Sequence, residues 1–274
     1  MTDHSNEEHD EPVIATPPSP WRTRDFRLVL IGGFVNDTGD WLLLVALPVY
    51  VFIKSGSGTA TAILFVVELV AALILGPVGG SLVDRWDLRR TLIATNLAQA
   101  VTLTPLLAVT GTRIWPAYLV VGAQAMLTQI NNPASVALLP RVVTPDQLTV
   151  ANAANSTSLS MARLVGSPLG GLAVGLGGIG AVVVIDVATF LAVAIATTLV
   201  RTDTRPITTD TVTGDVLAGG VRAGFNAIRA QRTLRSLLLI DALGQIAQGF
   251  FLVLFVVLRL QVYETDARRS VAVR

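Results

Sequence analysis

Long apolar stretches separated by short polar connections make up most of the chain from residue 28 onward. An α-helix needs about 20 mostly apolar residues to cross the hydrocarbon core of a bilayer. Seven stretches reach that length, at residues 28–53, 59–83, 91–110, 115–139, 150–176, 179–200 and 234–258. We number them spans one to seven. Nothing in the sequence suggests the alternating strands of about ten residues that build membrane barrels. The pattern therefore predicts an all-α, polytopic membrane helix bundle.

The polar segments divide the chain into five parts. Residues 1–26 are acidic, contain several prolines and have almost no apolar runs, so we expect a disordered cytoplasmic tail. Residues 27–200 form a six-helix unit, 201–233 a cytoplasmic linker and 234–260 the seventh span. The last part, 261–274, abandons the apolar pattern abruptly and is expected to be an aberrant polar C-terminal tail.

Part of the linker has helical periodicity. Apolar residues recur at three- and four-residue steps and form one stripe, with two arginines on its flank. The stripe consists of Leu217, Val221, Phe225 and Ile228, and the arginines are Arg222 and Arg229. This pattern predicts an amphipathic helix, which would lie either along the inner membrane surface or against the protein's own cytoplasmic face. Both placements remain open.

Arginines concentrate on alternate connections and so predict the orientation. They precede span one, follow spans two and four, and crowd the linker after span six, whereas the opposite connections hold only Lys54 and Arg113. Because cytoplasmic loops carry the excess of basic residues, we expect a cytoplasmic N-terminus in a multi-pass protein of the bacterial inner (cell) membrane.

Composition narrows the possible chemistry. The chain is 52% hydrophobic and 14% charged, whereas soluble domains carry about a quarter charged residues. It has no cysteine, and its only histidines, His4 and His9, lie in the N-terminal tail. No nucleophile–base pair, metal cluster or phosphate-binding loop is recognisable. We therefore expect no enzyme activity, no cofactor and no metal site. The net charge of +1 gives no indication of nucleic-acid binding.

Charged residues inside the spans are the main candidates for function. Each would cost at least about 2.5–3.5 kcal/mol facing lipid at mid-membrane, so each should face the interior or water. One interpretation is a pathway in which carboxylates hold a proton or a cation. The alternative is ion pairing that only fixes helix packing, for instance between the arginine and a carboxylate. The candidate pathway residues are Asp37, Asp40, Glu68, Arg163 and Asp186.

Small residues mark faces where helices pack closely in lipid. In span five, small residues recur every fourth position, and Pro168 lies among them. The series is Ala154, Ser158, Ala162, Gly166 and Gly170; span two has Ala72, Gly76 and Gly80 at the same spacing. Both faces should contact partner helices. Polar residues of span four, Gln124, Gln129, Asn131 and Asn132, could line a cavity or bond to neighbouring helices.

The loop after span two resembles the signature of the major facilitator superfamily, roughly G-x-L-x-D-R-x-G-R-R/K. Its matching residues are Gly80, Leu82, Asp84, Arg85, Arg89 and Arg90, whereas Asp87 and Leu88 depart from the pattern. These departures resemble the branch that contains the enterobactin exporter and related drug-efflux permeases. Further resemblances to that branch are Gly39-Asp40-Trp41, Leu139-Pro140-Arg141, Ala151-Asn152-Ala153, and Arg163 followed by Gly166-Ser167-Pro168-Leu169-Gly170-Gly171.

The resemblance implies the N-terminal six-helix half of a major facilitator fold plus one further helix. It implies a cytoplasmic gate at Gly80, Asp84, Arg85, Arg89 and Arg90, and an antiporter-like Gly/Pro motif at Gly166, Pro168, Gly170 and Gly171. Spans two and five would pack against a second half, with substrate bound between the halves near mid-membrane.

The expected function is secondary transport across the lipid bilayer. The resemblance favours proton-coupled efflux of drugs, siderophores or other small amphipathic molecules. The alternatives are uptake by the same fold, or a non-transporting remnant or half-transporter that needs a partner. The family has twelve spans and seven are found here, so we expect a truncated chain or the first half of a split transporter, completed by a missing second half or by a homo-oligomer.

Overall fold

The computed structural model describes residues 19–83, 85–109, 113–205 and, in short runs, parts of 229–247. The chain divides into two units, 1–211 and 212–274. The predictions for residues 1–18, for the linker helix, for Asp84 and for most of the seventh span and C-terminal tail lie outside the described residues. In the second unit, nearly all described residues are helical.

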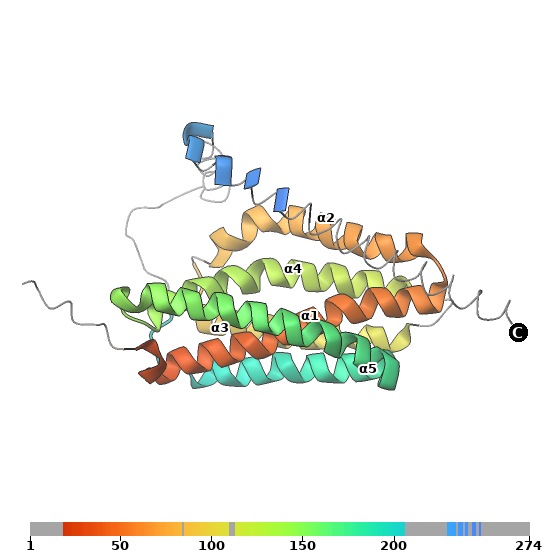
Figure 1. Ribbon diagram of the computed structural model, residues 1–274, viewed down its shortest axis with the longest axis horizontal. Coiled ribbons are helices and arrows are strands. Elements are labelled where there is room, and N and C mark those ends of the chain that lie inside the picture. Colours follow the sequence, from red (N-terminus) through yellow and green to blue (C-terminus); the bar gives the residue numbers. More distant parts are fainter. Residues whose placement is uncertain are drawn as a thin grey trace, which may run out of the picture. The chain divides into compact units, whose positions relative to one another are not determined.

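Helices make up the first unit, and no strand occurs among the residues described there. The α-helices are α1 (Arg24–Ser55), α2 (Gly58–Val83), α3 (Leu88–Thr102), α4 (Trp115–Leu138) and α5 (Leu148–Leu199), as Figure 1 shows. Short 3₁₀ helices lie at Pro20–Arg22, Thr104–Ala108, Leu139–Arg141 and Pro145–Gln147. The predicted all-α bundle is confirmed.

Helix α5 contains two helices joined at a glycine. Gly178 has φ 62° and ψ −160°, outside helical geometry, and Figure 1 shows the chain doubling back there. A positive φ suits glycine because it has no Cβ. The stretch therefore corresponds to predicted spans five and six, which gives six α-helices among the described residues between 24 and 199.

Four stretches of the described residues are long and apolar enough to cross a membrane: Arg24–Ser55, Gly58–Gly76, Leu88–Ala108 and Pro145–Leu199, the last of which contains the reversal. Helix α4 is not among them, although its 24 residues are sufficient in length. Its four side-chain amides lower its hydropathy, and the bundle covers part of them, since Asn131 is only 6% exposed.

The boundaries differ from the prediction at two places. Helix α1 begins at Arg24, so the segment just before residue 27 is helical and not part of a disordered tail. Phe26 is fully buried there and meets Trp21 edge-on, with 5.5 Å between the ring centroids. Helix α3 ends at Thr102, earlier than predicted, and a 3₁₀ helix containing Pro105 follows, because proline cannot donate the next helical hydrogen bond.

Helix α1 packs closely against the first half of α5 through small residues. A Cβ at Gly166 would lie 2.4 Å from the Thr38 carbonyl oxygen, and one at Gly170 would lie 2.4 Å from the Leu42 carbonyl oxygen. Ala162, one turn earlier on the same face, is fully buried. The small-residue face thus has its partner within this unit, whereas we expected a helix of a second half.

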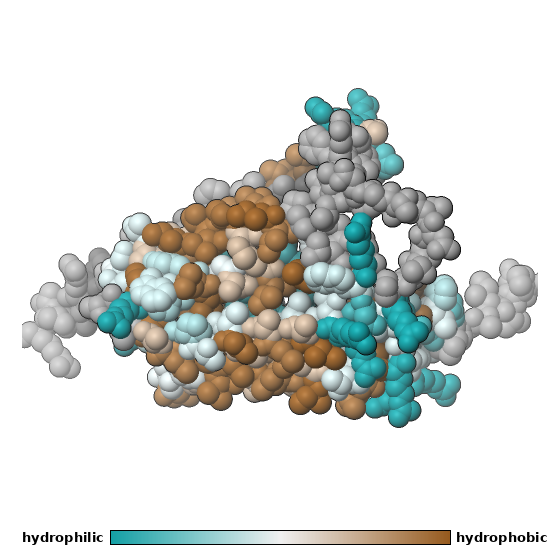
Figure 2. All heavy atoms as spheres, turned by 180° about the vertical axis from the view of Figure 1, so that it is seen from behind, coloured by the Kyte–Doolittle hydropathy of each residue, from teal (hydrophilic) through white to brown (hydrophobic). Residues whose placement is uncertain are grey.

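The surface suits a lipid environment. Large apolar side chains are exposed on α2 and on the first half of α5, among them Leu69, Leu73, Leu164, Leu172 and Leu176. Figure 2 shows broad hydrophobic areas with hydrophilic side chains gathered toward one end. Together with the long apolar helices, this surface identifies a multi-pass membrane protein.

Candidate functional site

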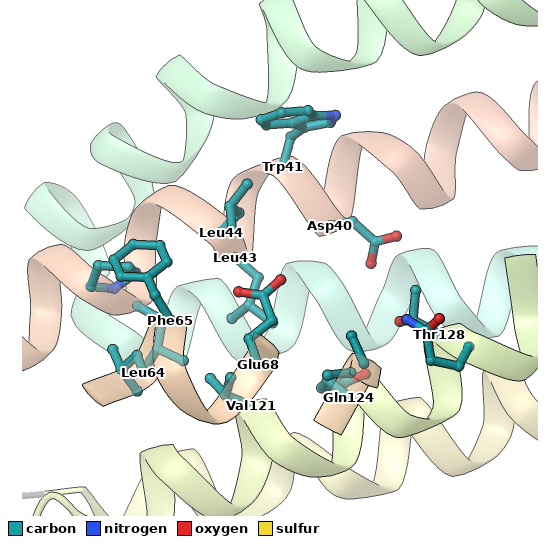
Figure 3. A pocket seen from close by; sticks show the side chains of 15 residues that line it. Asp40, Trp41, Leu43, Leu44, Leu64, Phe65, Glu68, Val121, Gln124 and Thr128 are labelled. Atoms are coloured by element: carbon teal, nitrogen blue, oxygen red, sulfur yellow. The ribbon is translucent and has the colours of Figure 1, made fainter. Parts of the chain in front are cut away.

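A cavity of about 240 Å³ lies between α1, α2 and α4. Its wall is mostly apolar, with a few polar groups concentrated on one residue of α1, one of α2 and one stripe of α4 (Figure 3). The lining residues are Asp40, Trp41, Leu43, Leu44, Leu47, Pro48, Leu64, Phe65, Glu68, Ala72, Val121, Gln124, Ala125, Thr128 and Gln129. Apolar walls with a few convergent polar groups are typical of small-molecule sites.

Two of the predicted pathway residues meet at this cavity. Asp40 from α1 and Glu68 from α2 both line it, and Figure 3 shows the Glu68 carboxylate directed toward α1. Asp40 is half-buried, and its Oδ2 accepts a hydrogen bond of 2.9 Å from Asn36 Nδ2. Glu68 is exposed at the edge of the cavity. The two carboxyl groups therefore face one mostly apolar space.

Asp186 lies outside the cavity but beside Asp40. It is fully buried, and a Cβ on Gly39 would lie 2.4 Å from its Oδ1. Thr189 Oγ1 donates to that Oδ1 at 3.2 Å, whereas the Asp186 Oδ2 has no hydrogen-bond partner. Asp186 and Asp37 are the two carboxylates close enough to Asp40 to repel its charge. A buried acceptor without a donor is uncommon and requires a physical explanation.

Among the residues that the structure describes, no carboxylate forms an ion pair with Arg163, the pairing that the packing interpretation gave as an example. Its guanidinium carbon lies 4.7 Å from the centroid of the Trp41 ring, which is a cation–π contact. Arg163 is exposed, and Trp41 lines the cavity. Figure 3 shows the Trp41 ring on the side of α1 away from Glu68.

A buried polar network fixes α4 against α3. Asn131 Nδ2 donates to Thr95 Oγ1 at 2.9 Å and to Gln99 Oε1 at 3.3 Å. Gln99 Nε2 donates to Thr128 Oγ1 at 3.4 Å, and Gln124 Nε2 donates to the Gln99 carbonyl oxygen at 3.0 Å. Of the span-four amides, Gln124 and Gln129 thus line the cavity, and Asn131 holds the helices together.

Sequence reasoning missed Thr128 and Phe65 as lining residues. Thr128 follows Gln124 by four positions, and Val121 precedes Gln124 by three, so the three share one helix face. That spacing was the available signal for Thr128. For Phe65, three positions before Glu68, the same spacing would have served once Glu68 was assigned to the cavity.

The loop between α2 and α3 is bonded to the segment where the chain leaves α5, and of the predicted gate residues Arg89 takes part in that contact. Asp87 caps α3 by accepting from the Arg90 backbone N–H at 2.9 Å, and its other oxygen accepts from Thr204 Oγ1 at 3.1 Å. Arg89 donates to the Thr198 carbonyl oxygen. Arg85 and Arg90 are exposed, and a Cβ at Gly80 would meet nothing within 4 Å. Asp87, the departure from the family pattern, is thus the loop carboxylate that the described structure shows bonded.

Asp25 also bonds the segment that follows α5, to which Asp87 is bonded. Its Oδ2 accepts from the backbone N–H groups of Arg201 and Thr202, at 2.9 and 2.8 Å, and from Thr202 Oγ1 at 2.7 Å. Helix α1 has 32 residues, about 48 Å, so its first turn extends beyond a hydrocarbon core of about 30 Å. Burial works to raise the pKa of Asp25, but these hydrogen bonds outweigh it and hold the pKa below its ordinary value of 3.8.

The Gly/Pro motif divides into two faces. Gly166 and Gly170 form the close contact with α1, as described above. Pro168 is exposed, and a Cβ at Gly171 would meet nothing within 4 Å. The contact with α1 accounts for two of its four residues.

Comparison with known proteins decides the family. Residues 29–272 match the Major Facilitator Superfamily, which covers nearly the whole chain. The chain belongs to the Major Facilitator Superfamily. The match also runs into the segment that we expected to be an aberrant polar C-terminal tail, an expectation that stays a prediction.

The curated relatives that match this chain are distant from it in sequence and longer than it. An uncharacterized MFS-type transporter of Bacillus subtilis, YfiS, is 24% identical over 138 residues, which are 50% of this chain and 33% of that protein. Macrolide efflux protein A of Streptococcus pyogenes is 24% identical over 184 residues, 66% of this chain and 45% of that protein. A second uncharacterized MFS-type transporter of Bacillus subtilis, YvqJ, is 25% identical over 149 residues, 53% of this chain and 35% of that protein. The chain thus spans less than half of the length of the curated relatives it matches.

Proposed function

We propose that this chain forms the N-terminal half of a secondary transporter that exports small amphipathic molecules in exchange for protons. The observation that carries the proposal is the cavity between α1, α2 and α4, where Asp40 and Glu68 enter an otherwise mostly apolar space. Intramembrane carboxylates are costly, and they commonly mark proton or substrate pathways. Efflux is favoured over uptake by the similarity to a macrolide efflux protein.

In this proposal Asp40 takes part in proton exchange and Asp186 supports it. Two like charges so close together disfavour simultaneous ionisation, so a proton on one relieves the other. A proton on Asp186 would also lower the cost of burying its unpartnered Oδ2, because a neutral carboxyl group is less costly to bury than a carboxylate. Asp37 lies one turn before Asp40 and adds to the repulsion.

Transport itself belongs to the complete assembly. The superfamily works by rocking two six-helix halves around a central site, and this chain spans less than half of its relatives. We propose that the helices described here supply one of those two halves. The charged loop at Arg85, Arg89 and Arg90 is then the proposed gate on the cytoplasmic side, where the N-terminus also lies.

The test is export of a fluorescent cationic dye from bacteria that express the chain. We expect faster loss of dye than with the empty vector, and this gain should disappear with a protonophore and in Asp40→Asn. Asp146→Asn, an exposed position far from the cavity in sequence, serves as the matched control. Equal loss from vector and wild-type cells, with the protein present in the membrane, would refute transport by the chain alone and leave the half-transporter to be tested with a second half.

A further inference from the structure

The charge lining the cavity is of one sign. Its two ionisable lining residues are Asp40 and Glu68, and among the fifteen described lining residues there is no arginine, lysine or histidine. The remaining polar groups are the amides of Gln124 and Gln129 and the hydroxyl of Thr128. Amides and hydroxyls accept hydrogen bonds as well as donating them, so they do not reverse the sign of the site.

Arg163, a described cation that contacts a lining residue, is not itself part of the lining. Arg163 lies over the Trp41 ring at 4.7 Å and is exposed on α5, so its charge is already engaged by the aromatic face. An anion in the cavity would therefore meet two carboxylates and no cationic side chain on the lining. Its transfer from water into such a site would be strongly unfavourable.

Apolar and aromatic groups occupy the rest of the wall. Leu43, Leu44, Leu47 and Leu64 come from α1 and α2, and Phe65 adds an aromatic side chain, which Figure 3 shows beside Leu64. A wall of this kind buries hydrocarbon, and aromatic faces attract ammonium groups electrostatically. The combination fits a ligand with one apolar part and one positive charge.

The cavity also limits the size of the ligand. A volume of about 240 Å³ lies just below the range of about 300–1,000 Å³ that is usual for drug-sized ligands. This half therefore accommodates a small ligand, or the cationic end of a larger one that extends past Glu68.

We propose that the cavity between α1, α2 and α4 binds organic cations, with Asp40 and Glu68 as the counter-charges and the leucine and phenylalanine side chains as the apolar wall. This inference rests on the proposed function for its biological meaning, but it concerns binding alone. It excludes anionic molecules, siderophores with carboxylate groups included, as ligands of this cavity.

The experiment compares two probes that carry opposite charges on the same ring, benzyltrimethylammonium and benzenesulfonate. Binding to the purified full chain in a non-ionic detergent is measured by equilibrium dialysis at neutral pH. We expect the cation to bind at least about tenfold more tightly than the anion. The quaternary ammonium cannot donate a hydrogen bond, so the difference reports charge.

Variants locate the binding. Asp40→Asn and Glu68→Gln keep the size of each side chain and remove its charge, so each should weaken cation binding about tenfold, which is about 1.4 kcal/mol. Asp146→Asn should bind like the wild type, and a thermal unfolding curve of each variant shows whether it is folded. Equal binding of the two probes, no binding of the cation, or binding unchanged in both folded cavity variants would overturn the proposal. Cation binding without any dye export would contradict transport by this chain and leave the binding site intact.

Discussion

Gly170 and Gly171 stand side by side in α5 and face different surroundings. A Cβ at Gly170 would come within 2.4 Å of the Leu42 carbonyl oxygen in the α1 backbone, whereas one at Gly171 would meet nothing within 4 Å. The pair therefore separates the effect of helix contact from the effect of losing a glycine.

We predict that Gly170→Ala destabilises the protein by about 1–3 kcal/mol, because α1 and α5 must move apart. Gly171→Ala should be neutral or stabilise by up to about 1 kcal/mol, since alanine is the better helix former. Thermal unfolding of both variants in detergent measures the difference. Equal unfolding temperatures would show that the close α1–α5 contact does not exist in solution.

Individual residues also show where sequence reasoning stops. The cost of charge in a membrane was enough to predict that Asp40 and Glu68 avoid lipid, and both line the cavity. It could not show that Asp186 lies against Gly39 or that Arg163 meets Trp41, because those contacts depend on the rotation of each helix about its axis.

At the level of elements, the α3–α4 pair depends on one buried amide. Asn131 is 6% exposed and donates to Thr95 and Gln99, whereas its neighbour Asn132 is exposed. We predict that Asn131→Ala lowers stability by about 0.6–1.7 kcal/mol, the range measured for hydrogen bonds between membrane helices. Asn132→Ala should have little effect, and chemical unfolding of both variants makes the comparison. Similar losses in the two variants would contradict the network.

The end of α5 is tied to the start of α1, and that contact depends on pH. Because the pKa of Asp25 is lowered in the folded protein, its contribution to stability is complete above its ordinary pKa of 3.8 and is lost as the pH falls through the lower folded value. We predict that Asp25→Ala destabilises the protein by about 1–2 kcal/mol at pH 7, since a charged acceptor is removed from three donors.

The stability difference between wild type and Asp25→Ala should shrink as the pH falls below about 4. Unfolding temperatures measured from pH 7 to pH 3 test this, with Asp146→Asn as the control for a surface carboxylate. A difference that stays constant over the whole range would refute the role of the charged Asp25.

The existence of the elements was predictable, and their partners were not. Hydropathy alone placed the first six spans within a few residues, apart from the end of α3, because a bilayer imposes length and composition on each helix. Four-residue spacing identified Gly166 and Gly170 as a close-packing face, but the same spacing fits any partner helix. The contact between Asp25 and Thr202 joins residues 177 positions apart, and no local sequence pattern predicts such a contact.

At the scale of the whole molecule, the proposed function gives one cavity two ligands. If a proton and an organic cation compete for Asp40 and Glu68, binding of one releases the other. Such competition is a simple physical basis for exchange transport, because the site does not have to cross the membrane with both carboxylates uncompensated.

The most direct test of that claim is proton release on cation binding. Benzyltrimethylammonium is added to the purified full chain in weakly buffered detergent solution, and a pH indicator records the protons released. The account predicts release of up to about one proton per bound cation, absent in Asp40→Asn or Glu68→Gln and unchanged in Asp146→Asn. Cation binding without any proton release, at every pH at which the chain is folded, would contradict it.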